Sequence, residues 1–406
     1  MEPRKANIWW GPPKKFSSLI TERKISWLEL FYDLVYVIAI SRVTHHLAGH
    51  PDLNGLLDYG YLFSMIFWGW FNGSIYHDLH GSPGIRTRLM TLWQMMALAA
   101  LIICLSGPAD KVAFRGTIAI MVLQLYITYL WWSVGIYDKA HRVYNRPYTI
   151  CFLTALLLLF ITFFVKQPYQ QIIFWVALVL NYLHPFIVIG ALKRNNQDFA
   201  LSPSMVERLG LFTIIVFGET VLGVINGTVQ LQELNIQVWL NFGLGIFVVF
   251  GLWWIFFSLI ADRKSQRGYL NATFIEISYL PVLASLGALG ALFSGLFYSF
   301  EHPENTEGYW IKLFFGSSLS VFLWGITVIS CFLHYPEQFL YAKKLLRKLL
   351  VIAGAIILLL TLSFSGISLF AYLLVIFILL LIVIVIITRI WFLAELKQLE
   401  EAGQNA

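Results

Sequence analysis

The sequence predicts an all-α polytopic membrane protein with about twelve transmembrane helices. Of its 406 residues, 59% are hydrophobic and only 12% are charged, and the mean hydropathy is +0.73. A soluble globular protein carries about 25% charged residues, so this chain has too little polar surface to cover a water-soluble particle. Runs of about twenty apolar residues recur along the chain, which is the length that an α-helix needs to cross a bilayer.

Twelve spans follow one another along the chain, separated by short polar or charged segments. They are predicted at Trp27–Leu47, Leu56–His77, Leu89–Gly107, Gly116–Tyr137, Tyr148–Val165, Gln171–Ala191, Glu207–Val229, Val238–Ala261, Phe274–Phe300, Trp310–His334, Leu349–Leu362 and Leu369–Phe392. The eleventh span is short, and only a weak loop signal at Ser363–Ser368 separates it from the twelfth.

Basic residues predict the orientation of the chain in the membrane. With both termini inside the cell, nearly all of the 28 Lys and Arg residues lie in cytoplasmic segments. The exceptions are Lys111, Arg115, Lys166 and Lys312 in external loops and Arg42 within a span. Because short cytoplasmic loops are enriched in Lys and Arg, we expect a multi-pass protein of the inner (plasma) membrane with cytoplasmic termini. The positive charge belongs to these loops, so nucleic acid is not an expected partner.

The chain is predicted to divide into two six-helix halves at 26–200 and 201–395. A basic cytoplasmic tail at 1–25 and a cytoplasmic tail at 396–406 flank them. Both halves carry aromatic residues in their second span, within Trp68–Phe71 and Trp253–Phe256. Because each half has an even number of spans, the two repeats would be parallel, as in some transporters.

Each half opens on an S-x-x-E pattern, which is typical of a capping box at a helix start. The two pairs are Ser26 with Glu29 and Ser204 with Glu207. In a capping box the Ser side chain accepts a free N–H while the Glu reaches back to the cap. The two glutamates are therefore interpreted as capping residues, with a cytoplasmic gate as the alternative role.

Two segments resemble the signatures of a known family. ELFYDLVYVIAI at 29–40, running on to HHL at 45–47, resembles the opening signature of the bacterial low temperature requirement protein A family. ERLGLFTIIVFGE at 207–219 resembles its second signature, ERxGLFTIIxxGE. Tyr32 and Tyr36 stand where the family pattern has phenylalanine. The resemblance implies a role in growth at low temperature and brings no established substrate or reaction.

Charged residues inside the seventh and first spans are the main functional candidates. Glu219 lies twelve residues into its span, about 18 Å deep, where an acid is a functional candidate by default. On a helical wheel Arg208, Glu219 and Asn226 share one face, which predicts a polar stripe lining an interior. Arg42 lies at nearly equal depth, so we hypothesise an ion pair between Arg42 and Glu219. The alternative is that Arg42 extends to the outer head groups.

Asp33 is the second acid within a span. It lies one helical turn beyond Glu29 and about 9 Å past the start of the span. A carboxylate at that depth needs a partner, a cavity or a proton. Asp33 therefore either has a functional role or is structural, reaching back to the cytoplasmic interface or pairing with a neighbouring loop Arg.

Weaker cavity candidates are Asn181 and His184 in the sixth span and Glu276 in the ninth. Pro185 follows His184 and should free a backbone carbonyl and kink the helix, so these side chains either line a cavity or serve packing. Another polar cluster at the outer end of the first span contains His45, His46, His50 and Asp52. It matches no recognised zinc pattern, and we expect neither a metal nor a cofactor.

The leading hypothesis is a secondary transporter or flippase-like carrier of a small polar or lipid-linked solute, with Glu219 and Asp33 exchanging a proton. One alternative is an integral-membrane enzyme that modifies a lipid, using Asp33 with Asp78 or the His45 and His46 pair. The other alternative is that the protein is a channel or a sensor. Motifs for nucleotide binding or hydrolysis do not stand out. The expected partners are the lipid bilayer and a small-molecule or lipid substrate, and the sequence leaves the oligomeric state open.

Overall fold

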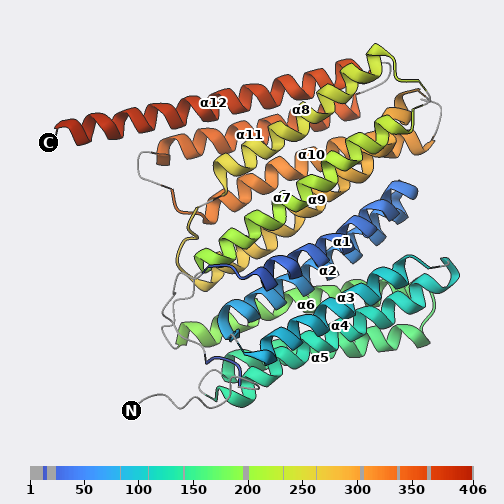
Figure 1. The fold of residues 1–406 in the computed structure, drawn as a ribbon, viewed down its shortest axis with the longest axis vertical. Coiled ribbons are helices and arrows are strands. Elements are labelled where there is room, and N and C mark those ends of the chain that lie inside the picture. The colour runs from blue at the N-terminus through green and yellow to red at the C-terminus, as the bar shows by residue number, and fades with distance from the viewer. Residues whose placement is uncertain are drawn as a thin grey trace. The chain divides into compact units, whose positions relative to one another are not determined.

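A computed structural model of the chain consists of α-helices joined by short connections (Figure 1). It describes residues 12–15, 24–82, 84–107, 109–139, 142–194, 201–231, 233–261, 263–301, 306–335, 339–363 and 367–404. The helices in these residues are α1 (Trp27–Gly49), α2 (Leu53–His80), α3 (Ile85–Leu105), α4 (Ala109–Tyr137), α5 (Arg142–Ile161), α6 (Tyr169–Arg194), α7 (Pro203–Val229), α8 (Ile236–Leu259), α9 (Tyr269–Glu301), α10 (Thr306–Phe332), α11 (Leu340–Leu362) and α12 (Leu369–Gln404). A short 3₁₀ turn, Thr162–Phe164, follows α5.

The prediction of an all-α membrane protein is confirmed. Within the described residues, the ten helices α3 to α12 are long and apolar enough to cross a membrane, by length and composition. The α1 and α2 helices fall outside this set. They are long enough, but they are less apolar: α1 contains Glu29, Asp33 and Arg42, and α2 is rich in tyrosine, tryptophan, glycine and serine. Twelve spans arranged as two parallel repeats therefore stay a prediction.

Several helices are longer than the apolar stretches from which they were predicted. The α7 helix begins at Pro203 rather than Glu207, and α11 begins at Leu340 rather than Leu349. At its other end α12 continues to Gln404, into the segment expected to be a tail. Helical hydrogen bonds do not stop where the hydrocarbon layer stops, so a span can continue as a helix into the polar interface, where its charged residues are hydrated.

The chain divides into two compact units. Unit 1 comprises Met1–Val43, Asp58–Leu209 and Arg267–Thr273. Unit 2 comprises Thr44–Leu57, Gly210–Gln266 and Phe274–Ala406.

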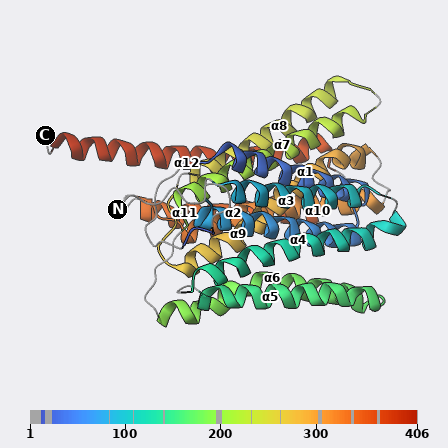
Figure 2. The same cartoon turned by 60° about the horizontal axis from the view of Figure 1, so that its bottom comes forward.

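In unit 1, helices α3, α4, α5 and α6 pack side by side in chain order, in the teal and green part of the ribbon (Figures 1 and 2). The aromatic stretch of α2 supplies much of the core of this unit. Phe67, Trp68 and Trp70 are completely buried, and Phe71 is nearly so. Because an aromatic side chain buries 150–250 Å², roughly, such a stretch contributes strongly to packing.

In unit 2, α8 packs along α12 and α10 packs along α11 (Figure 1). The α7 and α9 helices approach each other through glycine. A Cβ atom added at Gly223 would collide with the backbone carbonyl of Gly290. Beside this contact, the Thr220 hydroxyl donates to the Leu286 carbonyl at 3.0 Å. Small residues at the crossing allow the close backbone contact that stabilises helix pairs in membranes.

Candidate functional site: a buried Asp33–Arg208 pair

The first helix begins with the capping contact that the sequence predicts. The backbone N–H and the hydroxyl of Ser26 both donate to Glu29 Oε2 at 2.9 Å. In return, the Glu29 N–H donates to Ser26 Oγ at 3.4 Å. These bonds satisfy donors that a helix start otherwise leaves open. They also fix the Glu29 carboxylate at the beginning of α1.

The predicted cap at Ser204 is wrong. Because α7 begins at Pro203, the residue before the helix is Ser202, whose hydroxyl oxygen accepts the Met205 N–H at 3.0 Å. Proline is favoured at the first helical position, where its missing N–H costs no hydrogen bond. Ser204 therefore lies inside the first turn, where it is buried, and Glu207 is exposed.

Asp33 of α1 and Arg208 of α7 form a bidentate ion pair within unit 1. Arg208 Nη2 donates to Asp33 Oδ1 at 2.5 Å, and Arg208 Nε donates to Asp33 Oδ2 at 3.2 Å. Both side chains are only 1% exposed. The planar guanidinium matches both carboxylate oxygens, so the pair joins the first turns of α7 to α1 within this unit.

Two aromatic residues complete the surroundings of the pair. The indole Nε1 of Trp70 donates to Asp33 Oδ1 at 2.7 Å. The guanidinium carbon of Arg208 lies 5.8 Å from the centre of the Trp70 ring and 5.6 Å from that of Tyr32. These distances are within the range of cation–π attraction, so the rings stabilise the cation after its removal from water.

A second carboxylate lies on the other side of the guanidinium. Glu29 Oε1 is 3.6 Å from Arg208 Nη1, which is close enough for an ion pair. However, no group among the described residues forms a hydrogen bond with the buried Arg208 Nη1. One guanidinium therefore stands between two acids, and one of its nitrogen atoms retains hydrogen-bonding capacity.

A polar network next to the pair connects α1, α2 and α3. Gln94 Nε2 lies 2.7 Å from the hydroxyl oxygens of both Tyr32 and Tyr36 and 3.1 Å from the Gly69 carbonyl. Gly73 makes room for it, because a Cβ there would collide with the Tyr32 hydroxyl and lie 2.6 Å from Gln94 Nε2. The network places the Tyr32 ring beside Arg208.

The proposed partner of Glu219 is not tested. Arg42 lies in unit 1 and is exposed, whereas Glu219 and Asn226 lie in unit 2 and are half-buried. Among the described residues of unit 2, the Glu219 carboxylate has no hydrogen bond or ion pair. Arg208, which was expected on the same polar stripe, instead bonds to Asp33. The Arg42–Glu219 pair therefore stays a prediction, and the Asp33 pair becomes the stronger candidate.

Pro185 frees a backbone carbonyl, as the sequence predicts, and that carbonyl belongs to Asn181. Its oxygen accepts the indole N–H of Trp68 at 3.0 Å and lies 2.8 Å from His184 Nδ1. The side chain of Asn181 exchanges two amide hydrogen bonds with Gln124, at 2.7 and 2.9 Å. The group is buried and well bonded, so we interpret it as a contact that joins α2, α4 and α6.

Glu276 is a buried acid of α9 in unit 2. Only 7% of the residue is exposed, and its carboxyl has no hydrogen bond or ion pair among the described residues. Its place among the cavity candidates therefore stays a prediction.

The histidine cluster at the end of α1 makes local contacts. The His46 and His50 rings lie 4.9 Å apart, and Asp52 Oδ1 accepts the Gly55 N–H at 2.7 Å, which caps α2. Throughout the part of the chain that the structure describes, no three His, Cys, Asp or Glu side chains gather as a metal site would require.

Sequence reasoning missed Trp70, Tyr32 and Gln94 as members of the site. Trp70 is one of several aromatic residues in a row, so its N–H donor did not stand out. The substitution of tyrosine for phenylalanine at 32 and 36 was the available signal, because both hydroxyls lie beside Gln94.

Comparison with known proteins gives two matches. The family model described as "Bacterial low temperature requirement A protein (LtrA)" matches residues 24–388. An uncharacterised protein of Rhizobium meliloti (strain 1021) is 26% identical over 313 residues, which cover 71% of this chain and 72% of the relative. The matched family residues include both Asp33 and Arg208.

Proposed function

The chain belongs to the bacterial low temperature requirement A protein family, and we propose that it is a membrane carrier for a small polar or lipid-linked solute that bears a negative charge. The observation that carries the proposal is the buried Arg208, whose Nη1 has no hydrogen bond within the described part of the chain although two carboxylates lie near its guanidinium.

Arg208 is the group that would bind the solute. Guanidinium groups recognise carboxylates and phosphates through paired N–H donors, and a buried one does so without competition from water. Trp70 and Tyr32 hold the guanidinium on two sides, so it is positioned before a solute arrives. An anion would take the place of Asp33 on Arg208.

A proton would control that exchange. While Asp33 is ionised it occupies two guanidinium nitrogens and repels an incoming anion. Protonation of Asp33 would remove this repulsion and weaken the ion pair, so anion and proton would bind together. Glu29 would keep one compensating charge near Arg208 after Asp33 is protonated and before the anion binds. Such a cycle is the expected behaviour of a proton-coupled carrier.

The test uses the purified full chain in proteoliposomes that contain a pH-sensitive dye. Phosphate, sulfate and succinate are the probes, each offered outside under an inward proton gradient. We expect the wild type to take up at least one of them together with protons. Arg208→Gln should reduce this uptake by about 10- to 100-fold, because charged hydrogen bonds contribute roughly 1.5–3 kcal/mol.

Arg88→Gln is the matched control, because Arg88 is an exposed basic residue of α3 in the same unit. Its uptake should equal that of the wild type. Uptake of none of the three anions, or equal uptake by Arg208→Gln and wild type, would contradict the proposal. A sustained unitary current in a planar bilayer would instead favour a channel.

We also propose that this transport supports growth in the cold, as the family description suggests. A deletion strain complemented with the wild-type gene should grow at low temperature, whereas complementation with Arg208→Gln should fail. Equal growth with the wild-type gene and with Arg208→Gln would show that growth at low temperature does not depend on Arg208.

A further inference from the structure

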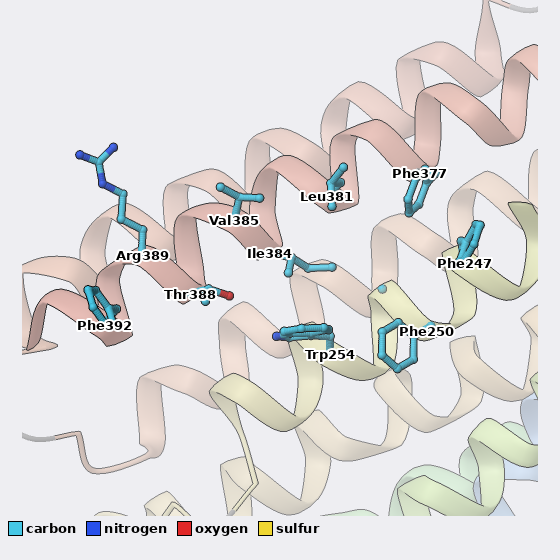
Figure 3. Close-up of a pocket in the computed structure, with 11 residues that line it drawn as sticks. Phe247, Phe250, Trp254, Phe377, Leu381, Ile384, Val385, Thr388, Arg389 and Phe392 are labelled. Carbon is cyan, nitrogen blue, oxygen red and sulfur yellow. The ribbon is translucent and has the colours of Figure 1, made fainter. Parts of the chain in front are cut away.

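An apolar groove runs between α8 and α12 in unit 2, with a volume of about 680 Å³ (Figure 3). Its size falls within the range of small-molecule sites, roughly 300–1,000 Å³. Figure 3 shows Phe250 and Trp254 of α8 on one side and Phe377 and Ile384 of α12 on the other. Both helices are candidate membrane spans, so this groove opens in a region that lipid occupies.

The lining of the groove suits a hydrocarbon chain. Apart from Thr388 and Arg389, the side chains that line it are aliphatic or aromatic. Phe250 and Val385 are half exposed, at 50% and 56%, so apolar surface remains available to a ligand. Hydrocarbon cannot form hydrogen bonds with polar groups, and the lining of this groove contains very few polar groups.

The groove is also long enough for a lipid tail. From Phe377 to Phe392 the α12 helix rises by about 22 Å, at about 1.5 Å per residue. Half of a hydrocarbon core of about 30 Å is about 15 Å, so the groove is longer than one leaflet is thick.

Positive charge is concentrated at one end of the groove. Arg389 lies in the lining one turn before Phe392, and its side chain extends away from Trp254 (Figure 3). Arg263 follows the end of α8, and its guanidinium carbon lies 4.2 Å from the centre of the Trp391 ring. Trp391 lines a separate pocket, so Arg389 is the cation that belongs to the groove itself, at the end where a head group would be.

We propose that this groove binds one anionic phospholipid, with an acyl chain between α8 and α12 and its phosphate near Arg389. The charge at the groove end selects an anionic head group, because a basic residue near a membrane surface attracts anionic lipid. This site consists of unit 2 residues alone and does not depend on the function proposed for Arg208.

Native mass spectrometry of the full chain in detergent, with added lipid, tests the proposal. The probes are phosphatidylglycerol and phosphatidylcholine with identical acyl chains. We expect the wild type to retain one phosphatidylglycerol molecule with about fivefold preference over phosphatidylcholine. Val385→Trp fills the groove and should remove this bound lipid, and Leu381→Trp should do the same if Val385→Trp aggregates.

Two matched controls separate the groove from general lipid contact. Ile382 is exposed on α12 but is outside the lining, so Ile382→Trp should retain the lipid. Arg389→Gln should lose the preference for phosphatidylglycerol, whereas Lys344→Gln, at an exposed basic residue of α11, should keep it. Equal retention of both lipids by the wild type, or unchanged retention in both groove-filling variants, would overturn the proposal.

Discussion

Asp33 and Arg208 are 175 positions apart in the chain and meet in a bidentate ion pair, with both side chains 1% exposed. The pair joins the start of α1 to the start of α7, the two helices whose opening segments resemble family signatures. Removing Arg208 would leave the buried Asp33 carboxylate without its cation, and removing Asp33 would leave Arg208 with only the more distant Glu29 as an acidic partner.

Loss of one partner should therefore destabilise the protein. Asp33→Leu or Arg208→Met should each lower the free energy of unfolding by about 3–5 kcal/mol, whereas the double variant should lose less, because apolar residues of similar volume can replace a buried pair. Thermal unfolding in detergent measures this. Glu207→Gln, which changes the exposed neighbour, serves as control. Single variants with wild-type melting temperatures would show that the pair does not hold the helices.

Trp70 should contribute to the stability of the protein through its N–H as well as through its ring. Trp70→Phe keeps most of the apolar volume but leaves Asp33 Oδ1 without this donor. Because Arg208 Nη2 still donates to this oxygen, we expect the loss of one hydrogen bond to a charged group, about 1.5–3 kcal/mol. Trp132→Phe changes an exposed tryptophan of the same unit and should have almost no effect. Equal melting temperatures for the two variants would contradict this role.

Gly73 should tolerate no side chain. Gly73→Ala places a methyl group against the Tyr32 hydroxyl and Gln94, so it should destabilise unit 1 and displace the ring beside Arg208. Gly60 provides the control in the same helix, because an added Cβ there meets only Trp175 at 3.9 Å. Gly60→Ala should be neutral or stabilising by about 0.5–1 kcal/mol, since alanine favours helix. Thermal unfolding followed by circular dichroism gives the melting temperatures of the two variants for comparison.

Trp68 should be coupled to Pro185 through the Asn181 carbonyl. In the wild type, Trp68→Phe removes the indole donor to this oxygen and should cost about 1–3 kcal/mol. In a Pro185→Ala background the residue 185 N–H can bond the same carbonyl, so Trp68→Phe should cost less. A double-mutant cycle in thermal unfolding gives the coupling. Strict additivity would show that the two residues act independently.

Much of the fold could be predicted because its causes are local. Apolar stretches of span length predict the helices, and Ser26 with Glu29 predicts the start of α1. Pro185 predicts a freed carbonyl in α6. The starts of α7 and α11 were misplaced, because hydropathy marks the hydrocarbon boundary rather than the last hydrogen bond of a helix.

The site was harder to predict because its partners are distant in sequence. Helical spacing placed Arg208, Glu219 and Asn226 on one face, but a wheel of one helix contains no information about the helix opposite. Pairing of Asp33 with a neighbouring loop Arg was one open interpretation, whereas its partner in the structure, Arg208, lies within α7. The Trp70 donor could not be selected from a row of aromatic residues without three-dimensional packing.

The most direct test of the central claim compares anion binding by the wild type and by Asp33→Asn, which keeps the shape of the side chain and removes its charge. Isothermal titration of the full chain in detergent with phosphate, sulfate and succinate, in two buffers of different ionisation enthalpy, gives affinity and proton uptake together. If Asp33 competes with the anion for Arg208, Asp33→Asn should bind at least about tenfold more tightly, since close charges interact by several kcal/mol even at an effective dielectric constant of about 20. Its binding should also take up no proton, whereas the wild type takes up one. Equal affinity and equal proton uptake in the two proteins would contradict the account.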